Sequence, residues 1–179
     1  PQSVYGRSKL AGERALQASG AQSLILRTSW VVGAHGGNFA KTILRLAAER
    51  DSLNVVADQF GAPTSALLLA EVTAQLIGQT EGQGRDGFPF GLYHLAPTGE
   101  TTWHQYAVYI LERASAAGMA LKLKAENVRA ITTAEYPLPA KRPANSRLNT
   151  AKLRQTFQCD LPDWKTGLDQ VLAQILRPS

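Results

Sequence analysis

The sequence predicts an α/β fold built on a largely parallel sheet. Strand-like and helix-like segments alternate along the chain, which is typical of that class. The first strand-like segment, residues 23–32, is mostly apolar on both of its faces, as expected for a strand that is covered on two sides. With 179 residues, 44% of them hydrophobic and 18% charged, the chain is long and apolar enough to bury a core.

Residues 3–20 and 38–51 are predicted to form the first two helices. Leu, Ala, Glu, Lys and Arg dominate the first of them, and Gly20 supplies a left-handed stop. The second helix begins after Asn38, a favourable N-cap residue, and its apolar side chains recur at helical spacing. The strand of residues 23–32 lies between these two helices in the sequence.

A second strand, residues 53–57, leads into a loop that ends in a third helix. Pro63 restricts the backbone of the residue before it, and Ser65 has a side chain that can cap a helix over residues 66–78. Residues 79–87 are polar and rich in glycine, which predicts a surface connection.

The rest of the chain continues the alternation. Thr102 and Gln105 have the spacing of a capping box and open a helix that ends at Gly118. A proline-rich loop is predicted at residues 136–143. The remaining elements are two strands and two helices, predicted at residues 92–95 and 128–132 and at residues 150–157 and 162–176.

The net charge of +5 belongs to one part of the chain. Residues 136–159 contain no acidic residue and five basic ones, which equals the whole surplus. These five are Lys141, Arg142, Arg147, Lys152 and Arg154. So local an excess favours a site for one small anion over a general polyanion-binding surface, and we expect no nucleic-acid partner. A nucleic-acid-binding module stays a third hypothesis, which predicts a steep salt dependence of DNA binding.

Other compositional features point to a cytoplasmic protein without membrane association. No apolar run approaches the roughly 18 residues of a membrane-spanning helix, and no secretory leader is recognisable. The single Cys159 cannot form an internal disulfide, which fits a reducing compartment. The three histidines are scattered without ligand spacing, so no metal site is expected from them.

The segment from Gly82 to Gly87 matches G-x-G-x-x-G letter for letter but stands in the wrong context. A dinucleotide-binding loop follows a strand and opens a helix, so that the pyrophosphate meets the helix N-terminus. This one follows a predicted helix and precedes a predicted strand. We interpret it as a surface loop and expect no loop for the cofactor phosphates within this sequence.

Tyr5 and Lys9 form a Tyr-x-x-x-Lys pair in the first turns of the first predicted helix. Residues four apart lie on one helix face, so the ammonium lies beside the phenol. A nearby cation favours the phenolate, and such a tyrosine can act as a general acid or base near neutral pH. The pair taken alone is also compatible with an exposed surface contact.

Several blocks together resemble a known enzyme family. Residues 3–13 are similar to the active-site helix of extended short-chain dehydrogenase/reductases. The Thr-Ser-Trp block at residues 28–30 and the Asp-Gln-x-Gly-x-Pro-Thr block at residues 58–64 resemble those of the dTDP-4-dehydrorhamnose reductases. Further blocks follow in the family's order at residues 36–39, 91–95 and 142–148, so the resemblance spans essentially the whole chain.

The resemblance implies the C-terminal part of a Rossmann-like NAD(P)-binding fold plus a small substrate-binding region. Residues 1–60 would hold the end of the Rossmann-like domain with the active-site helix. Residues 61–179 would be mainly substrate-binding, interleaved with the last sheet strand near residues 91–96. The Gly-rich cofactor loop would precede this chain, so we expect the isolated chain to be inactive.

The resemblance also implies roles for individual residues. Tyr5 would donate a proton to dTDP-4-dehydro-L-rhamnose during reduction by NADPH or NADH to dTDP-L-rhamnose, and Lys9 would tune Tyr5 and bind the nicotinamide ribose. Thr28 and Ser29 would lie near the nicotinamide. The implied substrate-binding residues are Trp30 at the deoxysugar and Asn38 and Arg142 at the diphosphate, where a helix N-terminus and a guanidinium are suited to the anion.

Two further expectations remain open at this point. A non-catalytic regulatory or binding subunit of the same fold is the alternative to an enzyme, because fold kinship does not establish chemistry. An exposed edge strand would favour pairing of two copies as a homodimer.

Overall fold

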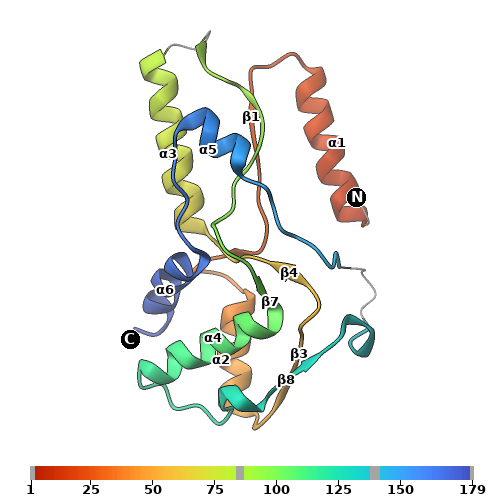
Figure 1. Cartoon of the computed structure of the whole chain (residues 1–179), viewed down its shortest axis with the longest axis vertical. Helices are drawn as coiled ribbons and strands as arrows, with labels where there is room; N and C mark the ends of the chain where they lie inside the picture. Colours follow the sequence, from red (N-terminus) through yellow and green to blue (C-terminus); the bar gives the residue numbers. More distant parts are fainter. Residues whose placement is uncertain (1–2, 84–86, 138–141, 178–179) are drawn as a thin grey trace.

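The computed structural model of the chain describes residues 3–83, 87–137 and 142–177 (Figure 1). Strands and helices alternate through these residues, and three of the four strand pairs that they form are parallel. The predicted α/β class is therefore confirmed.

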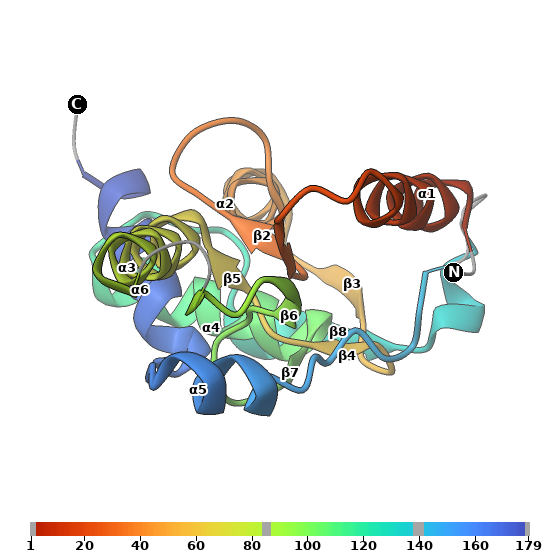
Figure 2. The same ribbon diagram turned by 90° about the horizontal axis from the view of Figure 1, so that it is seen from above.

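One parallel pair runs through the upper half of Figure 1. It consists of β1 (Leu24–Arg27) and β6 (Gly91–His94), which are paired along their whole lengths. α3 (Ala66–Gln83) and α5 (Ala151–Phe157) lie on one side of this pair, and α1 (Val4–Ala18) stands alongside β1 on the other, as the view in Figure 2 also shows.

A first core cluster lies between α3, β6 and α5. Leu68, Val72 and Leu76 recur every four residues along α3, so their side chains share the buried face of that helix. Leu95, directly after β6, and Leu153 of α5 are fully buried against them. This cluster holds the upper part of the molecule together without any contribution from α1, which has no buried residue.

The second parallel pair lies in the lower half of Figure 1 and consists of β3 (Leu53–Val56) and β8 (Val128–Ile131). α2 (Phe39–Glu49), α4 (Trp103–Ala116) and α6 (Trp164–Ile175) enclose the larger core cluster beside it. The α4 residues in that cluster follow helical spacing, and they are Tyr106, Ala107, Ile110, Leu111 and Ala114.

Two short strand pairs connect these halves. β2 (Val31–Val32) pairs in parallel with β5 (Thr64–Ser65), and β4 (Phe60–Gly61) pairs in antiparallel orientation with β7 (Thr101–Thr102). Two 3-10 turns flank β8, namely η2 (Ala125–Asn127) before it and η3 (Thr133–Glu135) after it.

The sequence-based boundaries differ from the structure at several places. The loop predicted between residue 57 and the third helix contains the short strands β4 and β5. The single strand predicted over residues 23–32 is divided into β1 and β2, because Trp30 between them has a φ of 50° that no strand residue adopts. The helix predicted over residues 66–78 continues to Gln83, so the expected surface connection begins later. Residues 84–86 of the rejected glycine motif lie outside the described residues, and the division at residue 60 stays a prediction.

The predicted helix caps are present. The side chains of Asn38, Ser65 and Thr102 accept hydrogen bonds from the N–H groups of Lys41, Leu68 and Gln105, respectively. Within the described part of the chain, none of the helices has both the length and the apolar character needed to cross a membrane.

The buried face of α4 yields a stability prediction. Ile110 has no exposed surface, so Ile110→Ala leaves a cavity and lowers the free energy of unfolding by about 2–5 kcal/mol. Glu112→Ala is the matched control on the exposed face of the same helix, with an expected change within about 0.5 kcal/mol. Urea unfolding measures both, and equal effects of the two variants would contradict the described core.

Candidate functional site

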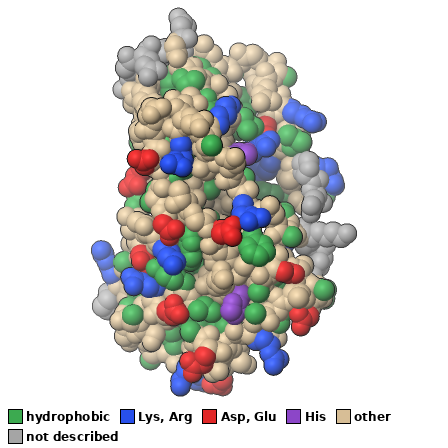
Figure 3. Space-filling view, viewed as in Figure 1, with side chains coloured by type: hydrophobic (Ala, Val, Ile, Leu, Met, Phe, Trp, Pro, Cys, Tyr) green, Lys and Arg blue, Asp and Glu red, His purple; other side chains and the backbone are tan. Residues whose placement is uncertain are grey.

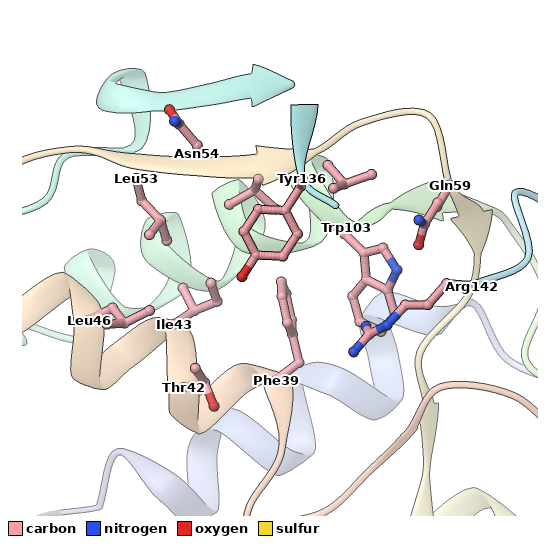
Figure 4. A pocket seen from close by; sticks show the side chains of 12 residues that line it. Phe39, Thr42, Ile43, Leu46, Leu53, Asn54, Gln59, Trp103, Tyr136 and Arg142 are labelled. Carbon is pink, nitrogen blue, oxygen red and sulfur yellow. The ribbon is translucent and has the colours of Figure 1, made fainter. Parts of the chain in front are cut away.

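The main candidate site is a cavity of about 310 Å³ between α2 and β3 (Figure 4). Two elements form its opposite walls. α2 is amphipathic and turns part of its apolar face toward the cavity, and β3 forms the wall across from it. The lining residues from these two elements are Phe39, Thr42, Ile43, Leu46, Leu53, Asn54, Val55 and Val56. A cavity of this size is at the lower end of the range for small-molecule sites.

Four residues from other segments complete the cavity. Trp103 starts α4, Gln59 follows β3, and Tyr136 and Arg142 come from the connection after β8. Tyr136 points into the cavity toward α2 in Figure 4. Aromatic rings, apolar walls and a guanidinium in one cavity suit a ligand with a flat ring and an anionic group.

Tyr106 supports two of the aromatic walls from behind. Its ring lies 5.0 Å from that of Phe39 and 6.1 Å from that of Trp103, between centroids. Burial raises the pKa of the Tyr106 hydroxyl far above its ordinary value, so this group stays neutral. The cavity is therefore backed by an uncharged, closely packed aromatic layer.

Trp30 is held between two neighbours. On one side its ring stacks on Trp103, with centroids 3.8 Å apart and planes at 20°. On the other it lies so close to Gly61 that a Cβ there would be 2.6 Å from a Trp30 ring carbon. Trp103 lines the cavity and Trp30 does not. The sugar contact proposed for Trp30 stays a prediction, and its ring already packs against Trp103 and Gly61.

Trp103 is one of the cavity residues that the sequence analysis did not single out. A tryptophan that directly follows a helix cap is most often part of the core, and nothing in its spacing distinguishes it from Trp164 at the start of α6. The structure makes the difference, because Trp103 is only partly buried and faces the cavity, whereas Trp164 is buried.

Tyr5 and Lys9 lie on one face of α1, as the spacing predicted. The Lys9 Nζ is 5.4 Å from the centroid of the Tyr5 ring, and Tyr5 is 72% exposed. Ser3 caps the helix by accepting a hydrogen bond from the Gly6 N–H (3.1 Å). Both side chains are therefore free to meet a ligand, although neither lines the 310 Å³ cavity.

An ion pair fixes α1 to the rest of the molecule. The Arg27 Nε at the end of β1 donates to a Glu13 oxygen at 2.9 Å, and the second guanidinium nitrogen donates to the other oxygen. This hydrogen bonding holds the pKa of Glu13 below its ordinary value, against a smaller opposing effect of burial. The angle at which α1 presents Tyr5 therefore depends partly on this bidentate pair.

Thr28 and Ser29 follow β1 at its carboxyl end. Thr28 is exposed, and Ser29 lines a second cavity of about 340 Å³ together with Gly61 and Arg147. Ligands of parallel sheets collect at the carboxyl ends of strands, and this cavity lies just beyond β1 and β6. The nicotinamide contacts expected of Thr28 and Ser29 stay predictions.

Asn38 uses its side chain within its own loop. Its Oδ1 accepts from the Lys41 N–H (3.0 Å) and its Nδ2 donates to the Gly33 carbonyl (2.7 Å). The diphosphate contact expected of Asn38 stays a prediction, and the amide already has a structural role.

The basic window divides into residues with different partners. Arg147 pairs with Glu100 at 2.9 Å, Lys152 donates to the Leu92 carbonyl at 2.8 Å, and Lys141 lies outside the described residues. Among the described members, only Arg142 lines the 310 Å³ cavity. Basic and acidic side chains are interspersed over the face seen in Figure 3. The residues that the structure describes include no group of three or more His, Cys, Asp or Glu side chains placed to hold a metal ion.

The architecture is that of NAD(P)-binding reductases. A crystal structure of a dTDP-4-dehydrorhamnose reductase from Clostridium acetobutylicum matches 99% of this chain with a TM-score of 0.85 and 34% identity, and the chain covers 57% of it. A second, from Bacillus anthracis in complex with NADP, matches 97% of this chain with a TM-score of 0.81 and 33% identity, and the chain covers 56% of it.

The family model described as the RmlD substrate binding domain matches residues 1–177, and the chain belongs to that family. The chain is 51% identical over 175 residues to the dTDP-4-dehydrorhamnose reductases of Shigella flexneri and of Escherichia coli K12, a match that covers 98% of this chain. It spans 57% of the length of these relatives. The resemblance drawn from the sequence blocks is confirmed.

The close approach of Gly61 to Trp30 predicts an intolerant glycine. Gly61→Ala forces the Trp30 ring away, which disturbs its stack on Trp103 and lowers the free energy of unfolding by about 1–3 kcal/mol. Near-UV circular dichroism reports the tryptophan pair and urea unfolding reports the stability. Gly12→Ala in α1, where a Cβ meets nothing within 4 Å, is the control and should be neutral or stabilising. Similar results for the two variants would contradict the described packing.

The Glu13–Arg27 pair predicts a pH-dependent stability. The pKa of Glu13 is lower in the folded state, so its contribution is complete above the ordinary carboxyl value and is lost as the pH falls through the folded value. Glu13→Gln is expected to lower the free energy of unfolding at pH 7 by roughly 0.2–1 kcal/mol, because Arg27 is partly exposed to solvent. Urea unfolding should show this difference shrinking between about pH 5 and pH 3. A difference of constant size would mean that the ion pair is not its cause.

Proposed function

We propose that this chain is the catalytic and substrate-binding part of a reductase that converts dTDP-4-dehydro-L-rhamnose to dTDP-L-rhamnose with NADPH or NADH. The observation that carries the assignment is the Tyr5–Lys9 pair, with the ammonium 5.4 Å from the ring centroid at the exposed start of α1. Membership of the family and the names of the relatives support it. A cytoplasmic location and a homodimer remain predictions of this proposal.

The 310 Å³ cavity is the proposed site of the nucleotide. Phe39, Trp103 and Tyr136 offer aromatic surfaces to a flat base, and the Arg142 guanidinium offers paired N–H donors to a phosphate group. The apolar walls behind these groups lower the local polarity, which strengthens a charge-assisted hydrogen bond. The cavity therefore has the chemistry that a dTDP-linked sugar requires.

Tyr5 is the proposed proton donor. Its hydroxyl would donate to the ketone oxygen at C4 of the sugar as that oxygen gains charge, and the Lys9 ammonium would stabilise the resulting phenolate. A bound nicotinamide in its reduced form supplies the hydride in this chemistry. Lys9 can also donate to a ribose hydroxyl, because the Nζ stands on the exposed face of α1 beside Tyr5.

The cofactor contacts available in the described residues fit only the nicotinamide end. Tyr5, Lys9 and Thr28 are exposed polar side chains, and Ser29 faces the 340 Å³ cavity at the carboxyl ends of β1 and β6. The strand–glycine loop–helix arrangement that binds the pyrophosphate is expected elsewhere in the enzyme. The chain's own residues therefore hold the reacting end of the cofactor and the proton.

Removal of the Tyr5 hydroxyl tests the catalytic assignment against the non-catalytic alternative. Because the chain spans 57% of the Escherichia coli relative, the assay uses a chimera in which that relative supplies the remaining part. Tyr5→Phe is expected to lower kcat by about 10²–10⁴-fold, the usual contribution of a general acid. Tyr109→Phe, whose hydroxyl bonds Asp169 away from the cavity, is the control and should leave kcat unchanged. Full turnover by Tyr5→Phe would exclude the proposed role.

Binding of dTDP to the 179-residue chain tests the nucleotide site directly. Arg142→Ala removes the guanidinium from the cavity and is expected to weaken binding by about 10–100-fold. Arg154 lies in the same basic window but does not line the cavity and is 4.0 Å from Asp160, so calorimetry should give Arg154→Ala the affinity of the unaltered chain. Equal losses of affinity for dTDP in both variants would indicate nonspecific attraction of the anion. In a separate assay, steep salt dependence of DNA binding would favour the nucleic-acid hypothesis.

A further inference from the structure

Tyr136 and Arg142 of the cavity lie on the same connection, which runs from the end of β8 to residue 146. Both flanks of this connection bond a single short loop, residues 57–60, which directly follows β3. The position of Tyr136 therefore depends on how firmly this loop holds the flank before it, and that of Arg142 on how firmly the loop holds the flank after it.

The flank before Tyr136 is held by a carboxylate. The Thr133 N–H donates to both oxygens of Asp58, at 2.9 and 3.0 Å, and the Thr133 hydroxyl donates to the Asp58 Oδ1 at 2.6 Å. These hydrogen bonds, above all that from the hydroxyl, hold the pKa of Asp58 below its ordinary value. Asp58 is therefore ionised near neutral pH, and its bonds to Thr133 are charge-assisted.

Gln59, a second residue of the same loop, bonds Thr133 from the side of the cavity. The Gln59 Nε2 donates to the Thr133 Oγ1 at 3.0 Å, and Gln59 is buried and lines the cavity. Thr133 is therefore hydrogen-bonded both to the exposed carboxylate of Asp58 and to Gln59, whose side chain lines the cavity. The turn that contains Thr133 is itself closed by Glu135, which accepts from the N–H and hydroxyl of Thr132 at 2.7 and 2.8 Å.

The flank after Arg142 is held by backbone alone. The Phe60 N–H donates to the Ala144 carbonyl at 2.9 Å, and the Ser146 N–H donates to the Phe60 carbonyl at 2.8 Å. Substitution of a side chain leaves these bonds in place. A side-chain substitution can therefore weaken the hold at the flank before Tyr136, where Asp58 acts, while the flank after Arg142 stays in place.

We propose that Asp58 is a positioning residue, which orients Tyr136 toward the nucleotide through its bonds to Thr133. Asp58 is exposed and is not among the residues that line the cavity, so any effect of it on binding is indirect. An exposed carboxylate that merely stabilises its own loop would leave the affinity for a ligand unchanged. The inference rests on the proposed nucleotide site, and it adds a residue that does not touch the ligand.

The first test is a mutant cycle with dTDP as the probe on the 179-residue chain. Asp58→Ala is expected to weaken binding about tenfold, and Asp58→Asn, which keeps one acceptor oxygen for Thr133, about threefold. In a chain that also carries Tyr136→Ala and Arg142→Ala, Asp58→Ala should change the affinity less than about twofold, because coupled residues are not additive. Asp163→Asn is the control, since Asp163 also accepts from a backbone N–H, that of Lys165 at 3.0 Å, but lies away from the cavity.

Three results would overturn the proposal. The first is an affinity for dTDP that is unchanged in folded Asp58→Ala. The second is a loss of affinity from Asp58→Ala that is as large in the Tyr136→Ala, Arg142→Ala background as in the unaltered chain. The third is a loss of affinity in Asp163→Asn equal to that in Asp58→Ala. Melting curves of each variant establish that it is folded.

The second test needs no ligand and separates this inference from the proposed function. Amide hydrogen exchange at Thr133 and Tyr136 is expected to be at least about tenfold faster in Asp58→Ala, while exchange in α4 stays the same. If the unaltered chain does not bind dTDP, the proposed function fails, and exchange at Tyr136, whose N–H bonds the Thr133 carbonyl and not Asp58, decides whether Asp58 holds this segment in place. Unchanged exchange at both amides would overturn the positioning role of Asp58.

Discussion

The packing of Trp30 between Gly61 and Trp103 is the constraint on which the rest of the molecule depends. The backbone leaves β1, turns through a φ of 50° at Trp30 and enters β2, and the indole ring packs against the larger core cluster. Its carbonyl accepts a hydrogen bond from the Thr64 N–H at 3.1 Å, which fixes β5 beside β2. A residue with φ in the left-handed region is costly, and here the stack on Trp103 offsets that cost. One consequence is functional, because the same stack sets the orientation of the Trp103 ring that faces the cavity.

Much of the fold could be predicted from local signals. Apolar periodicity and capping residues located the helices, and the caps at Asn38, Ser65 and Thr102 are present as expected. The break between β1 and β2 could not be predicted in this way, because Thr28 to Val32 has ordinary strand composition. That break is imposed by tertiary packing of Trp30 on Gly61, which are 31 positions apart in the sequence. The extension of α3 to Gln83 was missed for the opposite reason, since the glycines after Ile77 are poor helix formers that a packed helix nevertheless tolerates.

The site was predictable where the chemistry lies within one element. Tyr5 and Lys9 are four residues apart on one helix, so their proximity followed from helix geometry alone. The cavity draws its walls from α2, β3, α4 and the connection after β8, and only the fold brings these segments together. Arg142 was found because the basic window drew attention to it. Trp103 carried no such signal, because it looks like a core residue. Asp58 lies in the Asp-Gln-x-Gly-x-Pro-Thr block, but nothing in that block indicated its bonds to Thr133. Both gain their importance from a partner distant in sequence.

The central claim is that the cavity between α2 and β3 receives the nucleotide. It is tested most directly by recording the indole N–H resonances of Trp30, Trp103 and Trp164 during a titration of the chain with dTDP. The account predicts a saturating shift of the Trp103 resonance, a smaller shift of Trp30 through their stack, and none at the buried Trp164. A saturating shift confined to Trp164, or binding of dTDP that leaves the Trp103 resonance in place, would contradict it.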